Sequence, residues 1–288
     1  MKNRGKSVIG GWWNLGLPSV FLLCLFFFLL GLFASVLFSQ QDVPTVRSRV
    51  LESVDLEKDF DPLLTGVSGD DSFTSIPFQV LSWFPRALYF PNFASIEQCQ
   101  SIIKIAKTSL EPSSLALRKG ETEETTKGIR TSSGTFVSAS EDKTGTLDLI
   151  EEKIARATMI PKTHGEAFNV LRYEIGQRYQ SHYDAFDPAQ YGPQKSQRVA
   201  SFLLYLSDVE EGGETVFPFE SAQNMDGTYD YSKCIGLKVK PRRGDGLLFY
   251  SLLPNGTIDL TSLHGSCPVI RGEKWVATKW IRNIEQDE

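Results

Sequence analysis

Three side chains from two distant parts of the chain constrain the fold of this sequence more than any other feature. His182 and Asp184 stand two residues apart, and residues two apart on a strand point to the same side. His264 comes much later, so it can join them only if two remote strands lie side by side. Two imidazole nitrogens and one carboxylate on one face of a metal, with the opposite face open, are the ligands of oxygen-activating non-haem Fe(II) sites. The pattern therefore predicts a sheet that carries such an iron site.

Two further observations bear on this metal hypothesis. An isolated His-x-Asp pattern is common by chance and often has no function, but this chain has only three histidines, and two of them belong to the pattern. Lys274 follows His264 by ten residues and could hold the far carboxylate of an organic acid bound to the iron. We therefore expect these four side chains to form the catalytic centre.

The N-terminal region carries a long apolar run. Residues 18–38 contain no charged side chain, and these 21 residues would span a bilayer as a helix. A cleaved signal peptide is the alternative, but its apolar core is normally only about 7–15 residues long. Basic residues precede the run, so the positive-inside rule leaves the N-terminus cytosolic and the bulk of the chain luminal. The sequence predicts a cytosolic tail (1–17), a transmembrane signal-anchor (18–38), a flexible luminal stem (39–75) and a catalytic domain (76–288).

A luminal location permits two covalent modifications. Asn255 begins a glycosylation sequon in a turn-like context, although such triplets also occur by chance. Disulfides are also permitted there, and we expect Cys234 and Cys267 to pair because they flank the last sheet segments. Two buried thiols are the alternative.

Short strands dominate the second half of the chain. Val199–Leu206 is nearly continuously apolar, as expected for a strand buried on both faces. Lys274–Ile281 alternates, which places Lys274 and Trp280 on the same side. Two helices precede the strands, the first beginning with a capping box at Ser95. The chain is therefore expected to be mainly β with flanking helices, with a double-stranded β-helix (jelly roll) as its core and a single transmembrane helix before it.

The net charge of the chain narrows the range of partners. It is -5, and binding a phosphate backbone calls for a basic surface, so nucleic acid is not expected as a partner.

The globular part of the chain resembles a known protein family. Residues 76–285 are similar to the prolyl 4-hydroxylases, which are Fe(II)- and 2-oxoglutarate-dependent oxygenases, and most similar to the membrane-anchored plant type. The matching blocks keep the family's order over most of the chain beyond the stem. They are Ser82-Trp83-Phe84-Pro85-Arg86, Arg130 to Gly134, Tyr173 to Asp184 with its His182-x-Asp184, Gln197 to Ala200, Gly212 to Pro218, and His264 to Trp275.

The resemblance implies a cofactor set. His182, Asp184 and His264 would hold Fe(II), and 2-oxoglutarate and O2 would take the open positions. L-ascorbate would keep the iron ferrous. The co-substrate would be oxidatively decarboxylated to succinate and CO2 while C4 of a peptidyl proline is hydroxylated.

The resemblance also implies the residues that bind the co-substrate and the polypeptide. Lys274 would pair with the C5 carboxylate of 2-oxoglutarate, with Tyr173 and Thr215 as candidates for further hydrogen bonds to it. Contacts to a proline-rich polypeptide, which docks against aromatic grooves as a preformed polyproline II helix, are expected from Arg130, Ser132, Glu166, Tyr179, Arg198 and Trp280.

The expected setting is the endoplasmic reticulum or Golgi membrane, with a single-pass type II topology and proline-rich secreted or cell-wall proteins as substrates. Two alternatives remain open. The chain could be a different 2-oxoglutarate oxygenase that acts on lysine or a small molecule, and competition by poly-proline would separate that case. It could also be an inactive membrane-tethered binding module, which the loss of a metal ligand or of Lys274 would mark; all four residues are present.

Overall fold

The computed structural model describes residues 17–39 and 75–286. The chain divides into two compact units, Met1–Phe60 and Asp61–Glu288. Each unit is considered by itself below.

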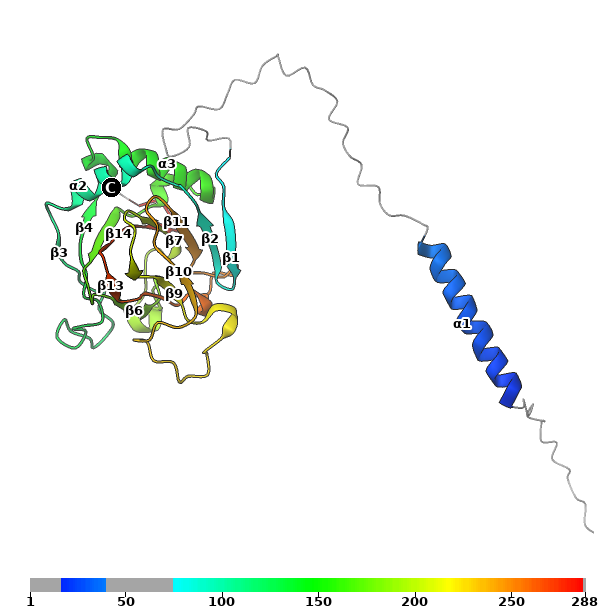
Figure 1. Ribbon diagram of the computed structural model, residues 1–288. Coiled ribbons are helices and arrows are strands. Elements are labelled where there is room, and N and C mark those ends of the chain that lie inside the picture. The colour runs from blue at the N-terminus through cyan, green and yellow to red at the C-terminus, as the bar shows by residue number, and fades with distance from the viewer. Residues whose placement is uncertain (1–16, 40–74, 287–288) are drawn as a thin grey trace, which may run out of the picture. The chain divides into compact units, whose positions relative to one another are not determined.

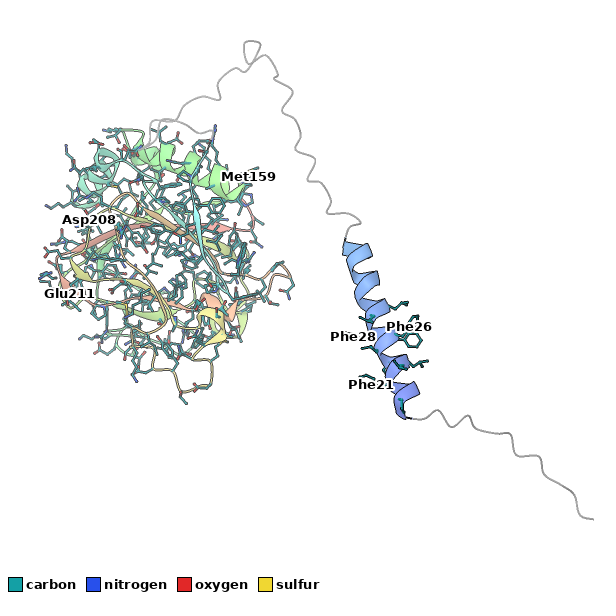
Figure 2. All side chains as sticks on the ribbon, turned by 45° about the vertical axis from the view of Figure 1, so that its right-hand side comes forward. Phe21, Phe26, Phe28, Met159, Asp208 and Glu211 are labelled. Atoms are coloured by element: carbon teal, nitrogen blue, oxygen red, sulfur yellow. A yellow bond between two sulfur atoms is a disulfide. The ribbon has the colours of Figure 1, made fainter. Side chains whose placement is uncertain are left out.

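The first unit contains the helix α1 (Leu17–Ser39), which is 23 residues long. Phe21, Phe26 and Phe28 are exposed on it (Figure 2). Within the described residues, no helix combines the length and the apolarity needed to cross a bilayer. The predicted cytosolic tail (1–17) and stem (39–75) lie almost entirely outside the described residues, and both stay predictions.

The second unit is built on an eight-stranded antiparallel sheet. Its central strands carry long apolar runs, and its edges are shorter and more polar. The order across the sheet is β1 (Gln79–Trp83), β2 (Arg86–Phe90), β11 (Gly246–Tyr250), β7 (Arg198–Tyr205), β14 (Lys274–Arg282), β5 (Phe168–Tyr173), β4 (Ser133–Val137) and β3 (Glu111–Pro112).

A smaller sheet faces this one and completes the expected jelly roll. Its four strands follow the order β10 (Leu237–Val239), β9 (Thr215–Phe217), β12 (His264–Ser266) and β6 (Tyr179–His182). A two-stranded sheet pairs β13 (Val269–Arg271) with β8 (Glu211–Gly212).

The apolar core lies on both faces of the large sheet. Successive residues of a strand point to opposite faces, so on β7 Phe202 packs in one buried cluster and Leu203 in the other. The first cluster lies under the helices, and the second contains Phe217 of the small sheet. This confirms the interpretation of Val199–Leu206 as a strand buried on both faces.

Helices cover one face of the large sheet. The helix α2 (Ile96–Ala106) begins at Ser95 with the predicted capping box, and Cys99 on its apolar side is fully buried. The helix α3 (Thr146–Thr158) buries Leu147 against the same core. Figure 1 shows both helices together at one side of the unit, with β6 and β9 at the opposite side. The short helices are η1 (Ala139–Glu141), η2 (Lys162–His164), α4 (Pro188–Tyr191), η3 (Glu220–Ala222) and η4 (Leu260–Ser262).

Candidate metal and co-substrate site

The strands β6 and β12 bring the predicted metal ligands together. They pair antiparallel, and His264 stands directly opposite His182. The residue after His264 is Gly265, where an added Cβ would lie 3.0 Å from the carbonyl oxygen of Tyr179. Glycine therefore allows the two strands to approach closely at the point where both histidines leave them.

The donor atoms of the three side chains are spaced as one ion requires. The two carboxylate oxygens of Asp184 each lie 3.5 Å from an imidazole Nε2, one from His182 and the other from His264. All three donor atoms lie within 4.8 Å of one another. Metal–ligand bonds of roughly 2 Å put neighbouring ligand atoms about 3 Å apart, so this donor set fits a single metal ion.

Hydrogen bonds from the other ring nitrogens fix both imidazoles. Nδ1 of His182 lies 2.9 Å from the carbonyl oxygen of Gln180, and Nδ1 of His264 lies 3.0 Å from that of Ser262. A carbonyl oxygen can only accept, so each Nδ1 carries the proton and donates it. Each Nε2 then has a free lone pair directed at the common point, as a metal-binding histidine requires.

The protonation states of the buried ligands also suit a metal. Burial lowers the pKa of His264 to about 4, so its ring is neutral at pH 7. Burial would raise the pKa of Asp184, but His264 and His182 together lower it well below its usual range. A neutral imidazole and an ionised carboxylate are the forms that bind a divalent cation.

Ser201 is a neighbour of the metal ligands that the sequence patterns did not identify. It lies on β7, is fully buried, and donates a 2.5 Å hydrogen bond from its hydroxyl to Oδ2 of Asp184. The signal was present: Ser201 is the only serine or threonine in the apolar run 199–206. Its bond fixes the orientation of the carboxylate from the large sheet.

Lys274 is a buried cation in the same cavity. It is only 1% exposed, and its ammonium donates a 2.9 Å hydrogen bond to the hydroxyl of Ser266. The ring of Tyr173 lies 5.4 Å away. Among the described residues no carboxylate forms an ion pair with it, and burial lowers its pKa to about 7. A buried cation of this kind is incomplete without an anion, so it fits an organic carboxylate beside the metal.

Tyr173 and Thr215 both line the cavity with Lys274 and the three metal-binding side chains. The hydroxyl of Thr215 is buried and accepts a 2.8 Å hydrogen bond from Tyr205. Tyr205, also fully buried, is a second neighbour of the site that the sequence patterns missed.

Three of the predicted substrate contacts lie together on one side of the cavity. The ring of Tyr179 stacks on His182 with centroids 3.6 Å apart, and the guanidinium of Arg130 lies 4.8 Å from the Tyr179 ring. Ser132 is buried and accepts a hydrogen bond from Nε of Arg130. Ser132 is therefore placed to orient Arg130, which lines the cavity while Ser132 does not.

The other three predicted contacts form a stacked ion-pair cluster. Glu166 accepts two 2.7 Å hydrogen bonds from Arg198 and a third from Arg282. The guanidinium of Arg198 lies 3.6 Å from the centroid of Trp280, which lines the cavity. Glu166 thus holds Arg198 against Trp280.

The predicted modifications fall on the same unit. The sulfur atoms of Cys234 and Cys267 lie within bonding distance, with Cα atoms 5.6 Å apart, which fits the expected disulfide. Asn255 is exposed in a turn closed by the Leu252–Ile258 bridge, and its side-chain oxygen accepts from Thr257.

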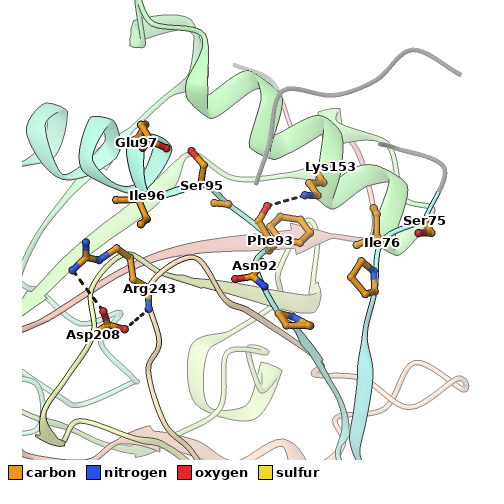
Figure 3. Close-up of a pocket in the computed structure, with 13 residues that line it drawn as sticks. Ser75, Ile76, Asn92, Phe93, Ser95, Ile96, Glu97, Lys153, Asp208 and Arg243 are labelled. Carbon is orange, nitrogen blue, oxygen red and sulfur yellow. Dashed lines mark hydrogen bonds and ion pairs between the residues drawn. The ribbon is translucent and has the colours of Figure 1, made fainter. Parts of the chain in front are cut away.

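A larger cavity lies elsewhere in the unit. It has a volume of about 630 Å³ and lies beside the start of α2, where Asn92, Lys153 and Arg243 contribute to its wall (Figure 3). Arg243 pairs with Asp208. None of the predicted site residues lines this cavity, so its size does not identify it as the reaction site.

Comparisons with known proteins agree with this geometry. The family described as the 2OG-Fe(II) oxygenase superfamily matches residues 168–282. Two similar proteins of Arabidopsis thaliana are "Probable prolyl 4-hydroxylase 9", 67% identical over 291 residues, and "Prolyl 4-hydroxylase 13", 55% identical over 292 residues; both alignments cover 100% of each chain. Among solved structures, the viral collagen prolyl hydroxylase of Paramecium Bursaria Chlorella virus-1, in complex with 2OG, is 29% identical with a TM-score of 0.51. That match covers 69% of this chain and 96% of the viral one.

Proposed function

Because the chain belongs to the prolyl 4-hydroxylases of the 2OG-Fe(II) oxygenase superfamily, we propose that it modifies proline-rich secreted or cell-wall proteins. It is a dioxygenase that requires Fe(II) and 2-oxoglutarate and hydroxylates peptidyl proline at C4. The observation that carries the proposal for its active site is the convergence of His182, Asp184, His264 and the buried Lys274 in one cavity.

We assign the iron to His182, Asp184 and His264. Bound there, Fe(II) supplies the oxidative chemistry that couples decarboxylation of 2-oxoglutarate to hydroxylation. The protein's part is to orient the ligands: two imidazoles fixed through Nδ1, and a carboxylate fixed by Ser201. L-ascorbate is expected as the reductant that maintains the ferrous state, as in the family.

We assign the far carboxylate of 2-oxoglutarate to Lys274. A charge-assisted hydrogen bond at this buried position would satisfy a cation that the protein alone leaves without a carboxylate. Tyr173 and Thr215 line the same space and can orient that carboxylate by hydrogen bonds. His182, Asp184 and His264 would hold the metal, and Lys274 with Tyr173 and Thr215 would hold the far carboxylate of the co-substrate.

We assign polypeptide binding to Arg130, Tyr179 and Trp280, which all line the cavity. Two aromatic rings and a guanidinium suit a polyproline II chain, which presents apolar rings and unpaired carbonyl groups. Ser132 orients Arg130, and the pair of Glu166 and Arg198 supports Trp280. Ser132, Glu166 and Arg198 therefore act on the polypeptide through Arg130 and Trp280.

The proposal includes the cellular setting. A signal-anchor with type II topology in the endoplasmic reticulum or Golgi membrane is proposed on the sequence alone, from the charge-free run 18–38 and the basic residues that precede it. The close approach of Cys234 and Cys267 and the exposed sequon at Asn255 suit a luminal domain.

The test is succinate release by the full chain in detergent, with Fe(II), ascorbate, 2-oxoglutarate and a proline-rich peptide. The variant His264→Ala should lose turnover, while His164→Ala, which changes the remaining histidine, should keep it. Mass spectrometry should find the oxygen on proline. Equal activity of His264→Ala and the wild type would remove His264 from the ligand set. Oxygen found on lysine, or no inhibition by poly-proline, would favour a different 2-oxoglutarate oxygenase.

A further inference from the structure

Two exposed aromatic residues stand at the turn of the β1–β2 hairpin. Trp83 is 67% exposed and Phe84 is 60% exposed. Single exposed aromatic residues are common on protein surfaces, but adjacent ones form an apolar patch of the kind that commonly marks a binding surface. Neither residue has a role in the site described above.

Strand register places this turn at the same end of the fold as the reaction site. Arg86 follows the turn, and the next residue, Ala87, pairs with Phe249, so Arg86 lies level with Tyr250. Tyr250 pairs with Ala200, and the neighbouring Ser201 pairs with Trp280. The turn therefore extends just beyond the row of the large sheet that carries Trp280.

The segment 251–263 connects this end of the large sheet to the small sheet, because it runs from the end of β11 to His264 at the start of β12. Arg86 anchors the hairpin to that segment, because it hydrogen-bonds the carbonyl of Leu252 and lies 4.5 Å from the Tyr250 ring. The hairpin turn and the metal-binding histidines therefore share one rim of the jelly roll.

Hydrogen bonds make this rim continuous. The amide of Ser221 in η3 donates a 2.6 Å bond to the carbonyl of Phe84, and η3 contacts η4. The hydroxyl of Tyr183, which stands between the ligands His182 and Asp184, donates a 3.1 Å bond to the carbonyl of Leu260 in η4. Figure 1 shows the hairpin turn beside these yellow and orange segments.

Further apolar side chains are exposed along the same rim. Leu260 is 54% exposed and Tyr231 is 50% exposed. The carbonyl of Tyr231 accepts a 3.1 Å bond from the amide of Ser181 on β6, which ties it to the strand that carries His182. We call Trp83, Phe84, Leu260 and Tyr231 the rim patch.

The charge beside the rim patch is negative. The segment 219–235 holds Glu220, Asp226 and Asp230 but only one basic residue, Lys233. Arg86 is already bound to a carbonyl and a ring. Acidic groups around exposed aromatics disfavour an anionic bilayer surface and favour a polypeptide that carries both proline and lysine.

We propose that the rim patch is a second docking surface for the polypeptide substrate, which holds a basic, proline-rich segment while another proline of the same chain reacts at the metal. This inference rests on the proposed function, since it requires a polypeptide substrate. A polyproline II chain advances about 3.1 Å per residue, so only a long substrate reaches both places.

The test compares peptides of two lengths on the full chain in detergent. A peptide of about four residues, roughly 12 Å long, occupies the reaction site alone, and a lysine-containing peptide of about twenty residues extends over the rim. The double variant Trp83→Ala/Phe84→Ala should raise KM for the long peptide about tenfold, as expected for loss of an aromatic contact cluster. Its kcat, and both constants for the short peptide, should not change.

Phe78→Ala is the matched control. Phe78 precedes the same hairpin, is 57% exposed, and lies at the end of β1 away from the turn. Phe78→Ala should change neither KM nor kcat for either peptide. A lysine-free long peptide should bind the wild type more weakly than the lysine-containing one.

Two results would overturn the proposal: an unchanged KM for the long peptide, or an equal rise in KM for both peptides. If the KM is unchanged and the double variant forms a smaller oligomer than the wild type, the patch is a contact between copies of the chain. Fluorescence anisotropy of the labelled long peptide gives its affinity without turnover. Weaker binding by the double variant, with no hydroxylation by any form, would refute the proposed function and leave the docking surface standing.

Discussion

Replacing Lys274 by methionine should stabilise the protein in the absence of its co-substrate and abolish binding of that co-substrate. Burial lowers the pKa of Lys274 from 10.5 to about 7, opposed by a weaker attraction to Glu214. Below pH 7 the folded and the unfolded chain both carry the charge, so the folded state bears the full burial penalty. As pH rises from 7 to 10.5 the unfolded chain keeps a proton that the folded chain has lost, and stability increases.

The size of this penalty follows from the same pKa values. A lowering from 10.5 to about 7, at 1.36 kcal/mol per pH unit, corresponds to about 5 kcal/mol. Methionine fills a similar volume without charge. At pH 6, Lys274→Met should therefore raise the free energy of unfolding by up to about 5 kcal/mol, and the gain should shrink as pH approaches 10.

The same variant should bind 2-oxoglutarate much more weakly. Removing one partner of a buried charge pair costs about 2–5 kcal/mol of binding free energy, or roughly 30- to several-thousand-fold in Kd. Urea denaturation at pH 6 and pH 10 measures the first effect, and the stabilisation of each protein by added 2-oxoglutarate measures the second.

Lys279→Met is the matched control on the same strand. Lys279 is almost as buried as Lys274, but it forms an ion pair with Glu151. Its removal leaves the carboxylate of Glu151, whose side chain is 11% exposed, without its partner and should destabilise the fold by about 3–5 kcal/mol. The reasoning would be refuted if Lys274→Met were less stable than the wild type at pH 6, or if its gain were the same at pH 10.

Three further predictions follow from the same geometry. Ser201→Ala should weaken Co(II) binding, read from the visible absorption of the bound ion, by about 10- to 100-fold, whereas Ser201→Thr keeps the hydroxyl and should bind as the wild type does; equal affinities for all three proteins would deny Ser201 a positioning role. Cys234→Ser should lower the free energy of unfolding in urea by about 4 kcal/mol, since the disulfide closes a loop of 33 residues, and Cys24→Ser should not; no difference between them would mean that Cys234 and Cys267 are unpaired. Asn255→Gln should abolish a glycosidase-sensitive shift in electrophoretic mobility of the secretory-pathway protein, and an identical shift in the variant would exclude Asn255 as the acceptor.

Local sequence patterns predicted much of the candidate site. The alternation of β14 predicted that Lys274 and Trp280 share a face, and both line the cavity. The β14 prediction succeeded because side-chain direction on a strand depends on residue parity alone. The spacing of His182 and Asp184 predicted that they converge, and they do. The premise that one strand carries both was wrong, because β6 ends at His182 and Asp184 lies in the bend that follows.

Other parts of the site could not be assigned from local patterns. Ser201 on β7 of the large sheet bonds Asp184, which follows β6 of the small sheet, and Lys274 on β14 of the large sheet bonds Ser266 on β12 of the small sheet. Glu166 and Arg198 carry opposite charges in the sequence, but only packing makes them one stacked unit with Trp280. Contacts between strands of different sheets have no sequence spacing to reveal them.

The residue types of the catalytic centre, the mainly-β class of the domain and the apolar N-terminal run could be predicted from the sequence, because each depends on composition and short-range periodicity. Three features required the folded structure: which side chains from the two sheets surround the metal site, the burial of Lys274 without a carboxylate partner, and the exposure of the aromatic residues on the rim. Those outcomes depend on strand order and register, which are set by long-range pairing and by the burial of two faces of one sheet.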